Sequence, residues 1–380
     1  MNGMIFRMKL NELRGEINEI DVKLMELFEK RMEVCINVAQ YKIDNKLPVF
    51  QTEREHEIIK KVREGSPKWL ENGSEVLFTT IMDISKSLQF QRLFSDKKEI
   101  KYTAFSTKND TAPTIACPGT KGSYSQIAAS TIFPNSKAVF FEDFEDVIKS
   151  VVDGKYKYGI LPIQNSTAGS VHQSYNLLKE YDCHIATSVK VKISHCIAVK
   201  NETDIKDVKK ILSHEQALAQ CSDYIKRNGF KPVEHTNTAL AAEFVKDSEL
   251  PLAAICSVEC ANRLGLKIIA ECITNVSDNY TRFILLSKEI LCSENANIIS
   301  VSLSLSHSRS ALYRLLTKFS VAGLNLLRIE NKPIANKDFD VVFYLDFEGS
   351  ISNPEVAMLI SELQYELSYF KFLGNYYEIQ

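Results

Sequence analysis

The sequence predicts a multidomain chain with three successive fold classes: an all-helical domain, an α/β domain and a ferredoxin-like βαββαβ domain. Apolar residues recur at helical spacing over residues 1–95. Short apolar strands alternate with helical stretches over residues 113–290. Residues 297–376 follow the order strand, helix, strand, strand, helix, strand. The polar segment 96–112 has little pattern, and we expect it to be a linker.

The composition allows several cores and excludes some classes of protein. A length of 380 residues suggests two or three domains, and a net charge of −2 gives no general attraction to nucleic acid or an anionic membrane. No apolar run approaches the roughly 20 residues that span a bilayer, and the N-terminus has no secretory h-region, so we expect a cytoplasmic chain without a membrane partner. The nine cysteines are scattered without a CxxC pair, and no metal or other cofactor is expected.

The N-terminal domain is expected to contain one very long helix, from about Lys9 to Ile43, which ends before the breaker segment 45–48. Further helices are expected over about 52–64 and 74–94. Three helices of such unequal length make a poor globular monomer, and an apolar stripe on a long helix usually packs against another chain. We therefore expect a homodimer or a larger homo-oligomer.

Several cations in this domain could form a pocket for an anion, although each alone is more simply a solvated surface charge. Arg31 and Lys42 are 11 residues apart, which returns them to nearly the same helix face at a separation of roughly 16 Å. Arg14 lies about 100° around the helix from Arg31, so it is better placed to serve the pocket of a partner chain. Ser85 and Gln89 share a face of the third helix by their i, i+4 spacing.

These stretches resemble the all-helical chorismate mutases. The match lies in LRGEINEID (13–21), EKRMEVCINVAQYK (29–42), LPVFQTERE (47–55) and SKSLQ (85–89). The resemblance implies chorismate as the substrate, prephenate as the product, and a helical dimer. One position departs from the family, which often has an acidic residue where this chain has Gln51; an amide can still accept a hydrogen bond from a substrate hydroxyl. The implied pocket residues are Arg14, Arg31, Lys42, Gln51, Arg54, Glu55, Ser85 and Gln89.

The rearrangement of chorismate to prephenate is pericyclic and needs no acid, base or covalent intermediate. The site must hold a dicarboxylate in its compact conformer and stabilise the charge that develops on the breaking ether oxygen. Arginine forks suit the carboxylates, and Lys42 and Gln89 are the candidates for the ether oxygen.

Three segments stand out in the α/β region. Residues 117–129 form a strand, a glycine-containing turn and a helix start, which could hold an anion but is also an ordinary turn. Residues 158–171 form a strand followed by small polar residues, and residues 277–283 place Asn, Thr and Arg beside an apolar strand. We expect strands at Thr114–Cys117, Tyr158–Pro162, His195–Val199 and Leu252–Ile255, and helices at Tyr124–Ile132, Phe144–Asp153, Ala217–Asn228, Thr238–Asp247 and Ser257–Leu264.

Together these segments resemble the prephenate dehydratases. The motif P-I-E-N-S is matched by residues 162–166, S-H-x-Q-A-L-x-Q-C is complete in residues 213–221, S-T-A-x-A-A is matched by residues 237–242, and N-x-T-R-F is complete in residues 279–283. The resemblance implies two α/β lobes with the site in the cleft between them. The first lobe would span roughly 114–190, with a return near 270–286, and the second roughly 194–268.

The dehydratase reaction expels carbon dioxide and water from prephenate as the ring becomes aromatic. By resemblance, Thr281 assists the departing hydroxide as a hydrogen-bond donor, because a free threonine is far too weak an acid. Gln164 stands where the family usually has Glu, which would slow catalysis if that Glu transfers a proton and would matter little if it only hydrogen-bonds. Arg282 is expected to bind a carboxylate. The other substrate-binding candidates are Asn165, Ser166, Ser213, Gln220, Thr238 and Phe283.

The C-terminal βαββαβ segment resembles the ACT domains that follow prephenate dehydratases and implies phenylalanine as an effector. The expected strands are Ile298–Ser306, Asn325–Glu330, Phe339–Phe347 and Tyr369–Leu373, with helices at Ala311–Val321 and Pro354–Leu367. The family's G-A-L and E-S-R-P motifs are both altered, so a purely structural dimerisation domain is an equal alternative. The candidate effector residues are Ser310, Ala311, Leu312, Glu330, Asn331, Lys332 and Pro333.

Two other interpretations remain. The chain could be an amino-acid-sensing binding protein that has lost both activities, because a two-lobed cleft with an ACT domain would also suit a sensor. It could instead be a mutase in which Gln164 has silenced the dehydratase. The presence of all the mutase cations and of Thr281 favours the bifunctional enzyme.

Overall fold

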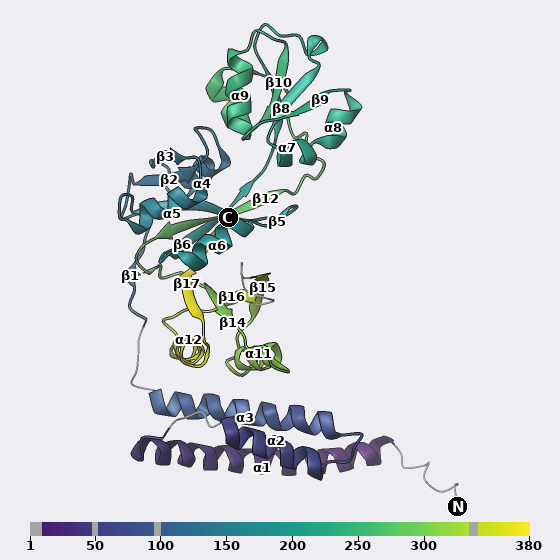
Figure 1. Cartoon of the computed structure of the whole chain (residues 1–380), viewed down its shortest axis with the longest axis vertical. Helices are drawn as coiled ribbons and strands as arrows, with labels where there is room; N and C mark the ends of the chain where they lie inside the picture. Colours follow the sequence, from purple (N-terminus) through teal and green to yellow (C-terminus); the bar gives the residue numbers. More distant parts are fainter. Residues whose placement is uncertain (1–9, 48–51, 95–99, 334–340) are drawn as a thin grey trace, which may run out of the picture. The chain divides into compact units, whose positions relative to one another are not determined.

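The computed structural model describes residues 10–47, 52–94, 100–333 and 341–380 (Figure 1). The chain divides into two compact units, which are considered separately below. One is helical and comprises Met1–Glu99, Leu305–Asn325 and Ser352–Ser368. The other is an α/β unit made of Ile100–Ser304, Leu326–Ile351 and Tyr369–Gln380. The two helices of the ferredoxin-like segment are thus grouped with the N-terminal helices, and its four strands with the α/β unit.

The N-terminal part of the helical unit has the three predicted helices: α1 (Leu10–Asp44), α2 (Thr52–Gly65) and α3 (Glu71–Phe94). Helix α1 ends where Lys46 adopts a left-handed conformation with φ of 55°. The backbone N–H of Leu47 then bonds to the carbonyl of Lys42, and that of Lys46 to the carbonyl of Ile43. This is the Schellman type of helix end, and it turns the chain within the breaker segment.

Helix α3 packs against both α1 and α2, and also against α11 (Ala311–Val321) and α12 (Pro354–Glu366). Its second half is largely buried, with Met82 and Phe90 in the interior. In contrast, α1 exposes a long series of apolar side chains within this chain, and each of those named here is more than half exposed: Leu10, Ile17, Ile20, Leu24, Met25, Leu27 and Val34.

The first lobe of the α/β unit is a seven-stranded sheet in the order β18-β6-β12-β4-β2-β3, with β5 added to β4. Strand β12 lies antiparallel between β4 and β6, and β2 lies parallel to β3 and β4. Separate apolar clusters cover the two faces of the sheet. The strands are β2 (Thr114–Pro118), β3 (Lys137–Phe141), β4 (Tyr158–Asn165), β5 (Gly169–Ser170), β6 (His184–Lys192), β12 (Tyr280–Ser287) and β18 (Glu378–Ile379), with helices α4 (Tyr124–Ile132), α5 (Phe144–Val152) and α6 (His172–Glu180).

The second lobe is a five-stranded sheet in the order β11-β7-β10-β8-β9. After β11 the chain returns to the first lobe through β12, as the two-lobed prediction requires. The strands are β7 (Cys196–Val199), β8 (Lys210–Ser213), β9 (Lys231–Glu234), β10 (Leu252–Cys256) and β11 (Lys267–Ala270), with the 3-10 turn η1 (Ile205–Asp207) and helices α7 (Glu215–Gln220), α8 (Ser222–Arg227), α9 (Thr238–Asp247) and α10 (Val258–Leu264).

The C-terminal strands form an antiparallel sheet in the order β15-β16-β14-β17, and with the two helices they follow the predicted ferredoxin-like order. Tyr344 and Leu373 of this sheet share an apolar cluster with Tyr175 of the first lobe. Gly374 lies so close to the carbonyl oxygen of Ile185 that a side chain would clash there. The predicted start of one strand, Phe339, lies outside the described residues. The strands are β14 (Ile298–Ser304), β15 (Leu326–Pro333), β16 (Val341–Glu348) and β17 (Phe370–Tyr376).

Two local predictions were wrong. The helix expected over 217–228 is two helices, because the backbone N–H of Asn275 bonds to the carbonyl of Gln220 and its side chain accepts from the N–H of Asp223. The second half of the expected linker is packed: β1 (Thr103–Ala104) pairs with β13 (Leu291–Cys292), and Phe105 is buried against Phe133. The local pattern of polar and apolar residues does not predict either interaction, since both depend on partners distant in sequence.

Candidate active sites

The helical unit brings four of the predicted mutase residues together. The guanidinium of Arg31 donates to the hydroxyl of Ser85 over 2.6 Å, and the ammonium of Lys42 donates to the side-chain oxygen of Gln89 over 3.4 Å. The two pairs show that α3 runs parallel to α1, since both residue numbers rise together. Lys42, Ser85 and Gln89 are all buried. The result is a row of cationic and amide groups along the α1–α3 contact.

The other described mutase candidates, Arg14, Arg54 and Glu55, have different surroundings within this chain. Arg54 is exposed and forms a surface ion pair with Glu57. Glu55 pairs with Lys86 of α3 at 3.1 Å. Arg14 is exposed on α1, roughly 26 Å along the helix from Arg31. Gln51 lies outside the described residues.

Opposing effects act on the charge of Lys42. Burial lowers the pKa of its ammonium, whereas the nearby Cys35 and Glu55 raise it. Burial has the larger effect, so the pKa is lowered overall. A desolvated ammonium attracts a substrate oxygen more strongly than a hydrated one does.

The α/β unit has a cavity of about 760 Å³ that is lined from both lobes. Five of the predicted dehydratase residues line it: Asn165, Gln220, Thr238, Thr281 and Phe283. Thr281 lies opposite Asn165 in the β12–β4 ladder, so the sheet itself sets their spacing.

The side chain of Asn165 fixes the orientation of the Thr281 hydroxyl. Its amide oxygen accepts from the backbone N–H groups of Thr167 and Ala168 and from the Thr167 hydroxyl, at 2.7–3.0 Å. Its amide nitrogen must therefore face the other way, where it donates to Thr281 Oγ1 and to Asn279 Oδ1, each at 2.9 Å. Since Thr281 Oγ1 accepts this hydrogen bond, its own proton remains available for an acceptor in the cavity.

A chain of polar contacts runs from Thr167 to Gln220, His195 and Tyr124 of the cavity wall, and of these four residues Gln220 was a predicted site residue. Gln220 Nε2 donates to Thr167 Oγ1, and Gln220 Oε1 lies 3.3 Å from His195 Nε2. Nδ1 of His195 is 3.2 Å from the hydroxyl of Tyr124. Gln220 presents its oxygen to Nε2 of His195, and the Tyr124 hydroxyl that faces Nδ1 donates its own proton to the carbonyl of Ser194 over 2.8 Å. A histidine at the start of an apolar strand was the only available sequence signal.

Helix N-termini supply positive partial charge to this cavity. Ser123 and Asn237, the N-caps of α4 and α9, both line it, and each caps its helix with a side-chain oxygen. The described residues that line the cavity include no lysine or arginine. Anionic groups there would thus be bound mainly by backbone N–H donors and helix dipoles.

Comparisons with known proteins agree with this geometry. Residues 115–290 match the prephenate dehydratase family, and residues 13–90 match chorismate mutase type II. The chain is 30% identical over 307 residues to arogenate dehydratase/prephenate dehydratase 2, chloroplastic, of Arabidopsis thaliana, which covers 78% of this chain and 81% of the relative. The chain belongs to the prephenate dehydratase family.

Full-length relatives also contain the mutase segment. The bifunctional chorismate mutase/prephenate dehydratase of Aquifex aeolicus (strain VF5) is 28% identical over 372 residues, which is 97% of this chain and 98% of that protein. A crystal structure of the prephenate dehydratase from Arthrobacter aurescens in complex with L-Phe covers 70% of this chain and 90% of its own, with 25% identity and a TM-score of 0.64. The chain is thus a fused chorismate mutase and prephenate dehydratase.

Four predicted dehydratase residues do not line the large cavity. Gln164 and Arg282 lie instead in a separate cavity of about 430 Å³ with Arg328 and Glu378. The guanidinium of Arg282 forms a short ion pair with Glu378, and it donates to Gln164 over 3.4 Å. Burial alone would raise the pKa of the Glu378 carboxyl, but Lys190 and Arg282 outweigh that effect and lower it. Arg282 thus has a protein carboxylate as its partner.

The other two residues, Ser213 and Ser166, form hydrogen bonds with backbone groups. The hydroxyl of Ser213 is fully buried and donates to the carbonyl of Ile255 over 2.7 Å. Ser166 donates to the carbonyl of Asp278 and accepts from the N–H of Tyr280, which ties the loop after β4 to the start of β12.

The candidate effector residues fall in different units. Ser310 precedes α11 with φ of 61°, a conformation that glycine adopts most easily, and Ala311 and Leu312 begin that helix. In the α/β unit, Lys332 pairs with Glu330 at 3.0 Å and lies over the ring of Tyr175. Asn331 and Pro333, the other residues of that motif, are exposed on β15.

Among the described residues, no helix has the length and apolar character of a bilayer span. The same part of the chain has no group of three or more His, Cys, Asp or Glu side chains that could hold a metal ion.

His195 should make the stability of the dehydratase depend on pH. Burial lowers its pKa to about 4 against an unfolded value of 6.5, although the hydrogen bond with Gln220 opposes the shift. The unfolded chain therefore binds more protons between these values, so this contribution is complete above pH 6.5 and is lost as the pH falls toward 4. When the pH falls from 7 to 4.5, the free energy of unfolding should decrease by roughly 2–3 kcal/mol more in wild type than in His195→Asn. Urea titration at both pH values measures this difference.

The exposed His172 provides the control. His172→Asn should keep the wild-type dependence on pH. An unchanged dependence in His195→Asn would show that His195 is not the group that titrates.

Proposed function

We propose that Arg31, Lys42, Ser85 and Gln89 bind chorismate in the mutase, and that Asn165 and Thr281 form the reacting centre of the dehydratase. The mutase assignment is supported by the contacts of Arg31 with Ser85 and of Lys42 with Gln89. The dehydratase assignment is supported by the orientation of the Thr281 hydroxyl in a two-lobed cavity. The product of the first reaction is the substrate of the second, so prephenate is the natural substrate here even though some relatives are named for arogenate.

The mutase needs positioning and electrostatics only. Arg31 binds a carboxylate, and Lys42 and Gln89 stabilise the negative charge that grows on the ether oxygen as it leaves carbon. A pericyclic step moves no proton, so neither residue acts as an acid or base.

The mutase site is completed by a second copy of the chain, with Arg14 entering from the partner. The large exposed apolar surface of α1 supports this dimer, because a monomer rarely leaves such a row of side chains in water. The exposure of Arg14, far from Arg31 on the same helix, supports a role across the interface.

Mixing two inactive variants tests both the residues and the shared site. Arg14→Ala and Arg31→Ala should each lose mutase activity by more than tenfold in kcat/KM, because each leaves a substrate charge unpaired. After subunit exchange, mixed dimers regain one intact pocket, and part of the activity should return. Exchange that mass spectrometry verifies but that restores no activity would rule out the shared site.

In the dehydratase, Thr281 donates its hydroxyl proton as a hydrogen bond to the departing hydroxide. The carboxylate that leaves as carbon dioxide and the side-chain carboxylate are held by the N-terminal ends of α4 and α9. Thr238 and Gln220 position the ring, and Phe283 packs against it. Aromatisation supplies the driving force, so the site needs only to stabilise charge on the leaving oxygen. Gln164 lies apart from this cavity, which argues against a silenced dehydratase.

Thr281→Val keeps the shape of the side chain but removes the donor. Dehydratase kcat with prephenate should fall by about 100-fold or more, since a preorganised donor to developing charge is lost. Phenylpyruvate absorbance in base measures the product, and mutase activity in the same protein is the control. Near-normal turnover would exclude this role for Thr281. A wild-type chain that makes no phenylpyruvate from chorismate would favour the sensor interpretation.

Phenylalanine is proposed as an effector of the C-terminal domain. A relative of this dehydratase has been crystallised with L-Phe. Two alterations in this chain should weaken binding: Ser310 adds a Cβ in a left-handed turn where the family has glycine, and Lys332 lacks the planar fork of arginine. Regulation further requires that the ligand prefer one conformation of the protein over another.

Restoring the family residues should strengthen both binding and inhibition. Calorimetric titration with phenylalanine should give a lower Kd for the combined Ser310→Gly and Lys332→Arg variant than for wild type, by about tenfold. The midpoint of dehydratase inhibition should shift by the same factor, since one binding event causes both. If millimolar phenylalanine neither binds to nor inhibits the wild-type enzyme, the domain is structural.

A further inference from the structure

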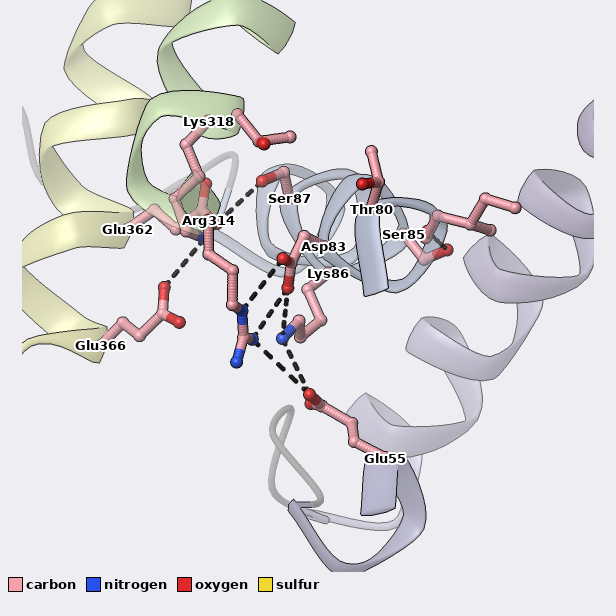
Figure 2. Close-up of polar contacts among 12 residues, drawn as sticks. Glu55, Thr80, Asp83, Ser85, Lys86, Ser87, Arg314, Lys318, Glu362 and Glu366 are labelled. Atoms are coloured by element: carbon pink, nitrogen blue, oxygen red, sulfur yellow. Dashed lines mark hydrogen bonds and ion pairs between the residues drawn. The ribbon is translucent and has the colours of Figure 1, made fainter. Parts of the chain in front are cut away.

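Helix α3 has polar side chains that face α11 and α12, in addition to those that face α1. Figure 2 shows Asp83, Lys86 and Ser87 of α3 beside Arg314, Lys318 and Glu362 of the C-terminal helices. Ser87 donates to Glu362 over 2.8 Å, and Glu362 also pairs with Lys318. One helix is therefore shared by the mutase pocket and the helices that follow the effector turn.

Arg314 makes the most directional contact in this interface. Its Nε and Nη2 donate to the two carboxylate oxygens of Asp83 over 3.0 and 2.8 Å, a paired geometry that only arginine can form. The side chain of Asp83 is only 2% exposed, so this carboxylate depends on its cationic partners rather than on water.

The same network reaches the mutase residue Glu55. Nη2 of Arg314 lies 3.6 Å from Glu55 Oε2. Lys86 bridges the two carboxylates, at 2.8 Å from Asp83 and 3.1 Å from Glu55. Figure 2 shows Glu55 approaching from α2, on the opposite side of these cations from Asp83.

Among the four described side chains of this cluster, the charges are balanced when Arg314 is present. Asp83 and Glu55 carry two negative charges, and Lys86 and Arg314 carry two positive ones. Without Arg314, Lys86 is left as the cation of this cluster that contacts both carboxylates. Asp83 is deeply buried, whereas Glu55 is 23% exposed, so Glu55 is the one with room to move. Its other nearby cation is Lys42.

We propose that Arg314 is a positioning residue for the mutase: by holding Glu55 in the Asp83–Lys86 network, it limits the attraction of Glu55 for Lys42 and so supports the binding of chorismate. A helix of the C-terminal domain thereby supports the chemistry of the N-terminal one. The inference rests on the mutase pocket proposed above. Loss of Arg314 leaves Lys86 shared between Asp83 and Glu55. Glu55 is then held less strongly, can shift toward Lys42, and adds unbalanced negative charge beside a pocket that takes a dianion.

Steady-state kinetics of the full-length enzyme with chorismate test the proposal. Arg314→Met should lower mutase kcat/KM by roughly tenfold, mainly through KM, because the substrate must compete with Glu55 for Lys42. Arg314→Lys should recover part of the loss. Arg314→Gln keeps a hydrogen-bond donor near Asp83 but no charge, so its kcat/KM should fall as far as that of Arg314→Met. This variant tests the proposal if the methionine variant does not fold.

A double-mutant cycle distinguishes this role from a merely structural one. In a Glu55→Gln background, Arg314→Met should cause little further loss, because the carboxylate through which it acts is gone. Dehydratase activity with added prephenate should stay unchanged in every variant. Arg309→Met, which removes an exposed charge from the same segment, should match wild type.

Several results would overturn the proposal. One is a kcat/KM of Arg314→Met or Arg314→Gln within twofold of wild type. Another is an equal loss with and without the Glu55 carboxylate, which would mean that Arg314 acts through the fold alone. Normal mutase activity in an Arg31→Ala variant would instead refute the mutase pocket itself, and with it this role for Arg314.

Discussion

The pleat of strand β12 is the constraint on which the dehydratase depends. Successive residues of a strand face opposite sides, so Thr281 and Phe283 line the large cavity while Arg282, between them, faces Glu378. A shift of one residue in register would exchange these roles. Strand β12 is held between β4 and β6, and the hydrogen bond from Asn165 to Thr281 links two residues that this register places opposite each other. The fold and the position of the Thr281 hydroxyl are thus set by the same ladder.

Helix α3 has a comparable role in the helical unit, with a different periodicity. Ser85 and Gln89 face the cations of α1, while Asp83 and Lys86 face Arg314. The backbone N–H of Arg314 bonds to the carbonyl of Ser310, so the ion network begins one helical turn after the candidate effector turn. A conformational change at Ser310 therefore has a short covalent and hydrogen-bonded route to Glu55.

The dehydratase cavity is notable for how it binds charge. It has no lysine or arginine among its described lining residues, so the proposed binding of prephenate there would rely on helix N-termini and amide donors. Such partial charges stabilise an anion without the large cost of burying a full cation. Because prephenate has two carboxylates and phenylpyruvate only one, decarboxylation removes half of these interactions and favours release of the product.

The sequence by itself determined the helical, α/β and ferredoxin-like order and both activities, and it predicted residues for the centre of each site. Motifs such as residues 279–283 are local, and apolar periodicity reports secondary structure directly. Only the tertiary structure decided the surroundings of these residues. It paired Arg282 with a glutamate 96 residues further along the chain, buried Ser213 against Ile255, and added His195 and Tyr124 to the cavity wall. The face on which a side chain ends depends on strand register and on distant partners, and neither is encoded in a local motif.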